Sequence, residues 1–186
     1  FEKVRNEQKK KLFDEHLDVL VTCEKFLNLN LIKSETEKNI SEGESKKLEF
    51  KSTFRFCLKK KSHQHFISDI IIKSVCAFLN TDSGGTLLIG VADDGEILGL
   101  ENDNFKSDDD CQLFFKNKVT SNLGTEIIPF VDFVIKKIKG KSIAEVKMKK
   151  STKPIYFKNV FYVRNGPSSD PLTLPDAVNY IQEHFD

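Results

Sequence analysis

The chain has 186 residues, enough for one domain of ordinary size plus an extension. Hydrophobic residues make up 39% of the sequence and charged residues 31%, so the composition is that of a folded protein with a real core, not of a disordered chain. The formal net charge of +1 excludes overall basicity as a sign of a nucleic-acid partner, and no apolar stretch approaches the ~18 residues that cross a membrane.

The start of the chain is predicted to be a helical extension. From residue 1 to about residue 32, hydrophobic side chains recur at helical spacing, with charged residues on the other face. Residues 33–43 turn polar and are predicted to be a linker. We therefore expect an extension with its linker over residues 1–42 and a compact domain over residues 43–186. The absence of an initiator Met indicates a fragment of a longer protein.

The compact domain is predicted to alternate strands and helices irregularly. In chain order, the expected elements are a strand at 47–51, a helix at 65–80, a strand at 86–91, a helix at 111–123, a strand pair at 130–138 and 142–148, short strands at 155–157 and 160–163, and a helix at 175–185. The strand at 86–91 is almost wholly apolar, which is typical of a central strand covered on both faces. The predicted fold class is α+β: a mixed β-sheet packed with helices, preceded by the helical extension.

The four cysteines are scattered and form no CxxC pair, which argues against a zinc knuckle and favours a reducing, cytoplasmic setting. Cys76 and Cys111 lie on apolar helical faces and are interpreted as core residues. Ser83-Gly84-Gly85 lacks the lysine and hydroxyl residue of a P-loop, so we expect a helix end there and no ATP binding.

Three segments in a fixed order carry the most specific pattern. They are Gly43–Lys51 (GESKKLEFK), Ala77–Gly95 (AFLNTDSGGTLLIGVADDG) and Phe161–Ser169 (FYVRNGPSS). Together they resemble the Schlafen AlbA-type domain, in which an E-S-x-x-x-E-F-K strand precedes a helix ending in A-F-x-N-t-x-G-G and an L-x-I-G-V-x-D strand. The resemblance runs from residue 43 to about residue 185, implies a nucleic-acid domain, and fits a bacterial single-lobe member.

The resemblance also implies a catalytic site. Animal members of the family include nucleases that cut transfer and ribosomal RNA through three carboxylates, which correspond here to Glu44, Glu49 and Asp93; a one-residue slip would select Asp94 instead. Carboxylates suit Mg²⁺ or Mn²⁺, and Lys51, on the same strand face as Glu49, would stabilise charge on the scissile phosphate. The alternative is that all three acids are ordinary surface charges. The zinc-binding residues of the animal proteins have no counterpart.

Basic residues cluster near two of these acids. The predicted nucleic-acid contacts are Lys46, Lys47, Arg55, Lys59, Lys60, Arg164 and Ser168. A second run of lysines between residues 136 and 153 could bind phosphates or could only aid solubility. Phe54, Phe56 and Phe66 could stack on bases or could belong to the core.

Two functional hypotheses follow. The first is a metal-dependent endoribonuclease that acts on structured RNA such as tRNA, in a bacterium as part of phage defence. The second is a non-catalytic DNA- or RNA-binding module of a regulator. Because animal members join two such lobes in one chain, we expect this single lobe to form a homodimer; no membrane association is expected.

Overall fold

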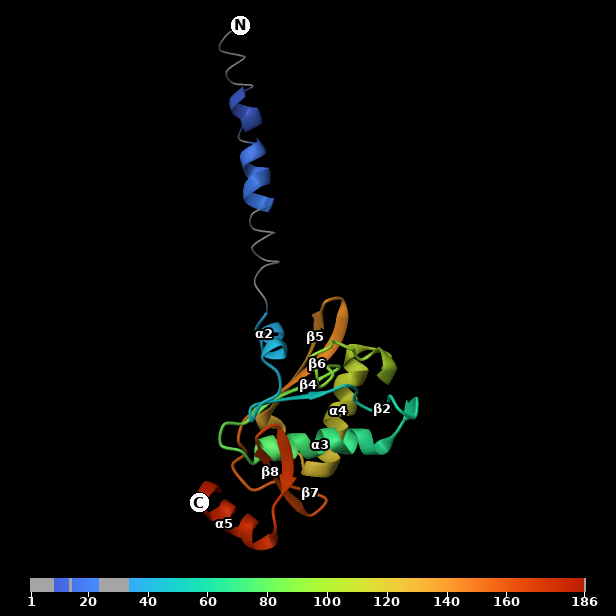
Figure 1. Cartoon of the computed structure of the whole chain (residues 1–186), viewed down its shortest axis with the longest axis vertical. Helices are drawn as coiled ribbons and strands as arrows, with labels where there is room; N and C mark the ends of the chain where they lie inside the picture. Colours follow the sequence, from blue (N-terminus) through green and yellow to red (C-terminus); the bar gives the residue numbers. More distant parts are fainter. Residues whose placement is uncertain (1–8, 14, 24–33, 186) are drawn as a thin grey trace. The chain divides into compact units, whose positions relative to one another are not determined.

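The computed structural model describes residues 9–13, 15–23 and 34–185 (Figure 1). The chain forms two compact units, Phe1–Lys38 and Asn39–Asp186. In the first unit, residues 9–13 and 15–23 are helical, as predicted for that part of the extension. The rest of the predicted extension, residues 1–8, 14 and 24–32, lies outside the described residues. None of the helices in the described ranges combines the length and the apolar character needed to span a membrane.

Helix α2 (Glu35–Glu42) forms within the segment predicted to be a linker, where no helix was predicted. The cause is local. The Ser34 hydroxyl accepts a hydrogen bond from the Glu37 backbone N–H (3.2 Å), and the Glu37 carboxylate accepts one from the Ser34 backbone N–H (2.9 Å). This reciprocal arrangement is a capping box, which satisfies backbone donors at a helix start without any hydrophobic periodicity.

The predicted mixed sheet is confirmed. Four strands follow the order β1-β4-β6-β5: β1 (Leu48–Lys51), β4 (Gly85–Ile89), β6 (Lys141–Met148) and β5 (Val131–Ile138). Strand β4 pairs parallel with β1, where Glu49 is level with Leu87, and antiparallel with β6. Strands β6 and β5 form an antiparallel hairpin whose turn residues, Lys139 and Gly140, both have positive φ.

Hydrophobic clusters cover both faces of strand β4. Leu87 and Ile89 pack in a cluster with helices α3 (His65–Leu79) and α4 (Asp108–Leu123). Leu88, between them, joins a cluster on the opposite face. The alternation confirms that β4 is a central strand buried on both sides. Cys76 and Cys111 are also confirmed in the α3–α4 core.

A small hairpin follows strand β1, where the sequence indicated only a lysine-rich loop. Strand β2 (Phe56–Cys57) pairs antiparallel with β3 (Ser62–His63). The buried Asp103 carboxylate, at the end of the 3₁₀ turn η1 (Glu101–Asp103), accepts the backbone N–H groups of Phe54, Arg55 and Phe56 at 2.7–2.9 Å. Burial raises the pKa of Asp103, and these donors oppose that effect.

The end of the chain forms a second small sheet and a closing helix. A 3₁₀ turn, η2 (Ile128–Phe130), precedes β5, and the remaining elements are β7 (Tyr156–Phe157), β8 (Val160–Asn165), β9 (Ser168–Pro171) and α5 (Leu174–Phe185). Strands β7, β8 and β9 pair in that order, and α5 packs its Ala177 against Phe161 and Val163 of β8. Strand β9 was not among the predicted elements, because Ser168–Pro171 has no alternation of apolar residues to mark it.

Candidate functional site

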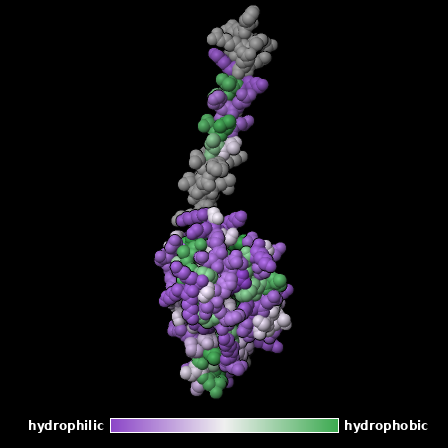
Figure 2. All heavy atoms as spheres, turned by 90° about the vertical axis from the view of Figure 1, so that its right-hand side faces the viewer, coloured by the Kyte–Doolittle hydropathy of each residue, from purple (hydrophilic) through white to green (hydrophobic). Residues whose placement is uncertain are grey.

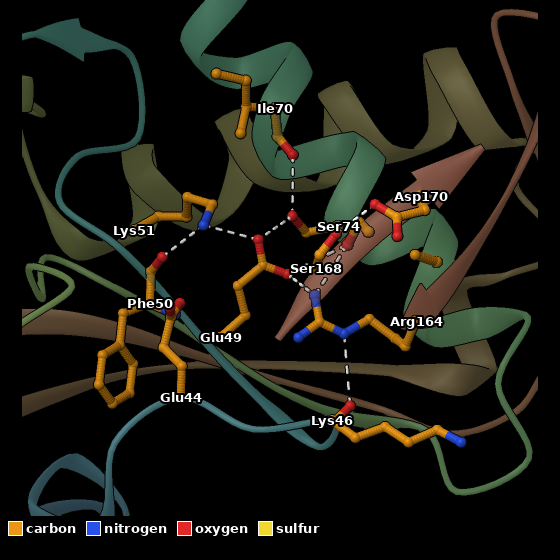
Figure 3. Close-up of polar contacts among 12 residues, drawn as sticks. Glu44, Lys46, Glu49, Phe50, Lys51, Ile70, Ser74, Arg164, Ser168 and Asp170 are labelled. Atoms are coloured by element: carbon orange, nitrogen blue, oxygen red, sulfur yellow. Dashed lines mark hydrogen bonds and ion pairs between the residues drawn. The ribbon is translucent and has the colours of Figure 1, made fainter. Parts of the chain in front are cut away.

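Glu49 lies in a buried polar cluster between β1, α3 and the β8–β9 hairpin (Figure 3). Its Oε1 accepts the Ser74 hydroxyl at 2.7 Å and lies 2.7 Å from the Lys51 ammonium. Its Oε2 accepts Arg164 Nη1 and, at 3.3 Å, the Ser169 hydroxyl. Both carboxylate oxygens are therefore occupied by protein donors, two of them cationic.

Arg164, predicted to bind phosphate, is instead a buried partner of Glu49. Every nitrogen of its guanidinium donates: Nη2 to the Ser45 carbonyl (3.0 Å), Nε to the Lys46 carbonyl (3.5 Å), and Nη1 to Glu49 and Ser169. Its side chain has no exposed surface. Burial lowers the pKa of Arg164, and the Glu49 carboxylate opposes that shift. In this arrangement the guanidinium faces no solvent from which a phosphate could approach.

The three segments singled out in the sequence meet at this cluster. Arg164, from the third segment, stacks 4.4 Å from the centre of the Phe78 ring in the second and bonds Glu49 in the first. The buried Asn80 amide donates to the carbonyls of Ile155 (2.8 Å) and Tyr162 (2.9 Å) and accepts the Ile155 N–H (2.9 Å). Residues of these three segments therefore hold the small sheet against α3 and β1.

The three predicted catalytic acids do not meet at one point. The chain bends between Ser45 and Leu48, and the Glu44 carboxylate accepts the Phe50 N–H of edge strand β1 at 2.7 Å. Asp93 is exposed in the turn after β4. The alternative acid, Asp94, accepts the Glu96 N–H at 2.9 Å within that turn.

These residues do not fit the predicted metal ion. Within the described residues, no group of three or more His, Cys, Asp or Glu side chains could hold one. A cation at Glu49 would have to displace the ammonium of Lys51 or the guanidinium of Arg164, because donors already fill both oxygens.

The remaining predicted contact residues divide into free and engaged ones. Lys46, Lys47, Lys59 and Lys60 are exposed, and none forms an ion pair with any described residue. Figure 3 shows the Lys46 side chain pointing away from Glu49. Arg55 is engaged, since its guanidinium donates to the carbonyls of Asp103 (2.8 Å) and Asn104 (3.0 Å). Ser168 is exposed and donates to Asp170.

The second lysine run is partly neutralised. The ammonium of Lys136 lies 2.7 Å and that of Lys147 3.6 Å from the buried Glu145 carboxylate. Lys150 lies 2.6 Å from Asp82. Three of its lysines therefore balance carboxylates of the same chain, so this run offers less free charge than its sequence indicates.

The cluster contains two serines: Ser74 was not predicted, and Ser169 was considered only as a further phosphate donor beside Ser168. Ser74 is a hydroxyl inside the buried, apolar stretch of α3, and Ser169 follows directly on the predicted contact Ser168. A polar side chain in a buried apolar stretch needs a partner, so Ser74 carried a usable signal. Nothing in the sequence distinguished Ser169 from its neighbour.

Comparisons with known proteins cover most of the domain. The sequence model of the family described as Schlafen, AlbA_2 matches residues 44–173. The crystal structure of the DIP2311 protein from Corynebacterium diphtheriae superposes with a TM-score of 0.57 at 18% identity, over 76% of this chain and 24% of that one. The chain thus spans about a quarter of that protein's length, and the likeness concerns the fold.

A second solved structure is the N-terminal domain of a RecG-related protein from Nitrosomonas europaea. It has a TM-score of 0.48 and 21% identity, and the match covers 76% of this chain and 95% of that one. No curated protein matches the chain.

Proposed function

The chain belongs to the Schlafen AlbA_2 family, which points to a nucleic-acid-related function, and we propose that its domain binds the phosphate backbone of structured RNA or DNA. One observation carries this proposal: around β1 the negative charge is buried and paired, whereas the positive charges of four lysines are exposed. Glu49 is buried and neutralised, whereas Lys46, Lys47, Lys59 and Lys60 face solvent without an acidic partner among the described residues.

The division leaves four ammonium groups in solvent on a chain of nearly neutral net charge. Lys46 and Lys47 precede strand β1, and Lys59 and Lys60 lie at the tip of the β2–β3 hairpin that follows it. Ammonium groups that contact phosphates release counterions from the nucleic acid, which favours binding at low salt. Contacts to the backbone read shape and not sequence, as suits a folded RNA whose base edges are hidden in a deep groove.

The test is binding at several salt concentrations. Fluorescence anisotropy with a labelled RNA hairpin and a labelled DNA duplex should give affinities that fall steeply as salt rises. The double variant Lys46→Ala/Lys47→Ala should bind both ligands more weakly and reduce the salt slope by about 1 to 2. The double variant Lys106→Ala/Lys116→Ala removes the same charge from exposed positions elsewhere and should behave like wild type. Wild-type binding that does not respond to salt would refute the proposal.

Metal-dependent cleavage of structured RNA such as tRNA stays a prediction from the resemblance. Its support in the geometry is the carboxylate of Glu49 beside the ammonium of Lys51, 2.7 Å apart on one strand face. The occupied oxygens of Glu49 count against a metal there. Incubation of the protein with labelled tRNA in Mn²⁺ or EDTA distinguishes the two functions: cleavage that requires the metal supports a nuclease, and salt-sensitive binding without cleavage supports a binding module. The predicted homodimer is tested by light scattering.

A further inference from the structure

A groove of about 320 Å³ lies beside the buried cluster, between the β2–β3 hairpin and the start of helix α3. The ammonium-bearing side chain of Lys51 belongs both to the cluster and to the wall of this groove. The rest of the wall is mainly apolar, with Phe56, Leu58, Phe66 and Ile70 among its residues and Lys59 at its side. Among the residues that the structure describes, no acidic side chain lines it.

The groove contains large apolar side chains that folding has left in contact with water. Phe66 is 45% exposed, Leu58 44% and Ile70 37%. Phe54, by contrast, is fully buried among other aromatic rings. Of the two predicted roles for these rings, core packing and base stacking, Phe54 has the first, whereas the ring of Phe66 is exposed and available for the second. An exposed apolar patch rimmed by polar groups is typical of an interaction site, and apolar and polar side chains mix on the face toward which the β2 hairpin projects (Figure 2).

Lysines surround the exposed ring. The ammonium of Lys60 lies 5.7 Å from the centre of the Phe66 ring, Lys59 is exposed, and the Lys51 side chain is 25% exposed. An occupant that matches this surface has a flat apolar face for Phe66 and negative charge at its edge for the lysines. A nucleotide whose base is unpaired has both, whereas an apolar peptide would leave the exposed Lys59 and Lys60 without counter-charges.

We propose that this groove binds an unpaired nucleotide, with its base against Phe66 and its flanking phosphates on Lys51 and Lys59. The inference rests on the proposed nucleic-acid binding and refines its ligand to RNA or DNA with looped or single-stranded bases. A base inside a duplex is stacked on both sides and would have to leave the helix to enter, so a fully paired duplex should use only the exposed lysines.

The experiment compares two RNA ligands of equal length, a hairpin with an unpaired loop and a blunt duplex, by fluorescence anisotropy at one salt concentration. Phe66→Ala should weaken binding of the looped RNA on the order of tenfold and leave duplex binding unchanged. Phe66→Tyr keeps an aromatic ring and should retain most of the affinity. Leu113→Ala, which truncates a side chain 57% exposed on α4, is the matched control and should change neither affinity. Circular dichroism and thermal melting establish that each variant is folded.

The possible failures are distinguishable. If Phe66→Ala changes neither affinity while Lys46→Ala/Lys47→Ala weakens both, the groove takes no base, yet the proposed function stands. If wild type binds neither RNA, the proposed function itself fails. If Phe66→Ala changes the molar mass measured by light scattering, the groove is occupied by a second copy of the chain and the inference is overturned.

Discussion

Glu49 and Arg164 lie 115 positions apart in the sequence, yet form an ion pair whose side chains are 6% and 0% exposed. The pair joins strand β1 of the main sheet to strand β8 of the small sheet. A buried charge that loses its partner is strongly unfavourable. Variants at Glu49 therefore test stability as well as function, and any loss of activity in them has to be compared with the folded fraction.

Arg164→Met is predicted to destabilise the protein by ~3–5 kcal/mol, because it leaves the Glu49 carboxylate buried without its guanidinium. The double variant Glu49→Leu/Arg164→Met removes both charges and should recover part of this loss. Urea denaturation followed by circular dichroism measures both. Lys47→Ala, at an exposed position, is the control and should stay within about 0.5 kcal/mol of wild type. Equal stability of Arg164→Met and wild type would contradict the role of the pair.

Asp103→Asn is predicted to destabilise the β2–β3 hairpin. The Asp103 carboxylate accepts three backbone N–H groups, and an amide presents its own N–H₂ to some of them. We expect a loss of about 2–3 kcal/mol, typical of hydrogen bonds to a charged acceptor. Thermal melting gives the overall effect, and hydrogen exchange should show faster exchange at residues 54–63. Unchanged protection there would mean that the carboxylate does not hold the hairpin.

The packing of helix α5 against the rest of its domain should weaken at acid pH. The Lys150 ammonium and the His184 ring each lie 2.6 Å from the Asp82 carboxylate, and the hydrogen bond from Lys150, aided by His184, lowers the pKa of Asp82 from 3.8. A carboxyl group whose pKa is lower in the folded protein stabilises the fold fully at pH values above its unfolded-state pKa. This contribution is lost as the pH falls through the folded-state pKa. Since Asp82 is largely exposed, solvent screens the interaction and the effect should be local.

Hydrogen exchange between pH 3 and pH 6 tests this dependence. After correction for intrinsic rates, amides of α5 should lose protection below about pH 4, while amides of α4 keep it. Asp82→Asn should show low protection in α5 at every pH. A wild-type α5 that stays equally protected at pH 3 would show that the Asp82 contacts do not hold the helix.

Removal of divalent metal is predicted to have no effect on folding or binding. Since donors of the protein occupy both Glu49 oxygens, EDTA should change neither the melting temperature nor the affinity for an RNA hairpin. Thermal melting with Mn²⁺ and with EDTA measures the first, and anisotropy the second. A rise in melting temperature with Mn²⁺ that disappears in Glu49→Gln would reveal a metal site at this residue.

The main sheet and its helices were predictable because their signals are local. The apolar run of β4 and the helical stripe of α3 follow from periodicity within a few residues. Helix α2 and strand β9 were not predicted, because neither depends on a hydrophobic pattern. The helix is stabilised by a capping box and the strand by its pairing with β8.

The candidate site was predictable only in part. Alternation along β1 correctly placed Glu49 and Lys51 on one strand face, where they form an ion pair. The partner of Glu49 was not predictable, because position 164 meets position 49 only after the small sheet has folded against α3. An isolated arginine in the sequence carries no sign of whether it will face solvent or a buried carboxylate.

The fixed position of Asn80 has a consequence for the order of folding and for where the chain can be cut. Its amide donates hydrogen bonds to Ile155 and Tyr162, which lie 75 and 82 positions further along the chain. The amide therefore lacks these partners until almost the whole domain has been made. A chain ending before residue 155 would keep α3 and the four-stranded sheet but would lose these partners of Asn80, the Arg164 partner of Glu49, and the core side chains of Ile155 and Phe157. Such a truncation should not fold stably, whereas a cut ahead of residue 34 removes none of these bonds.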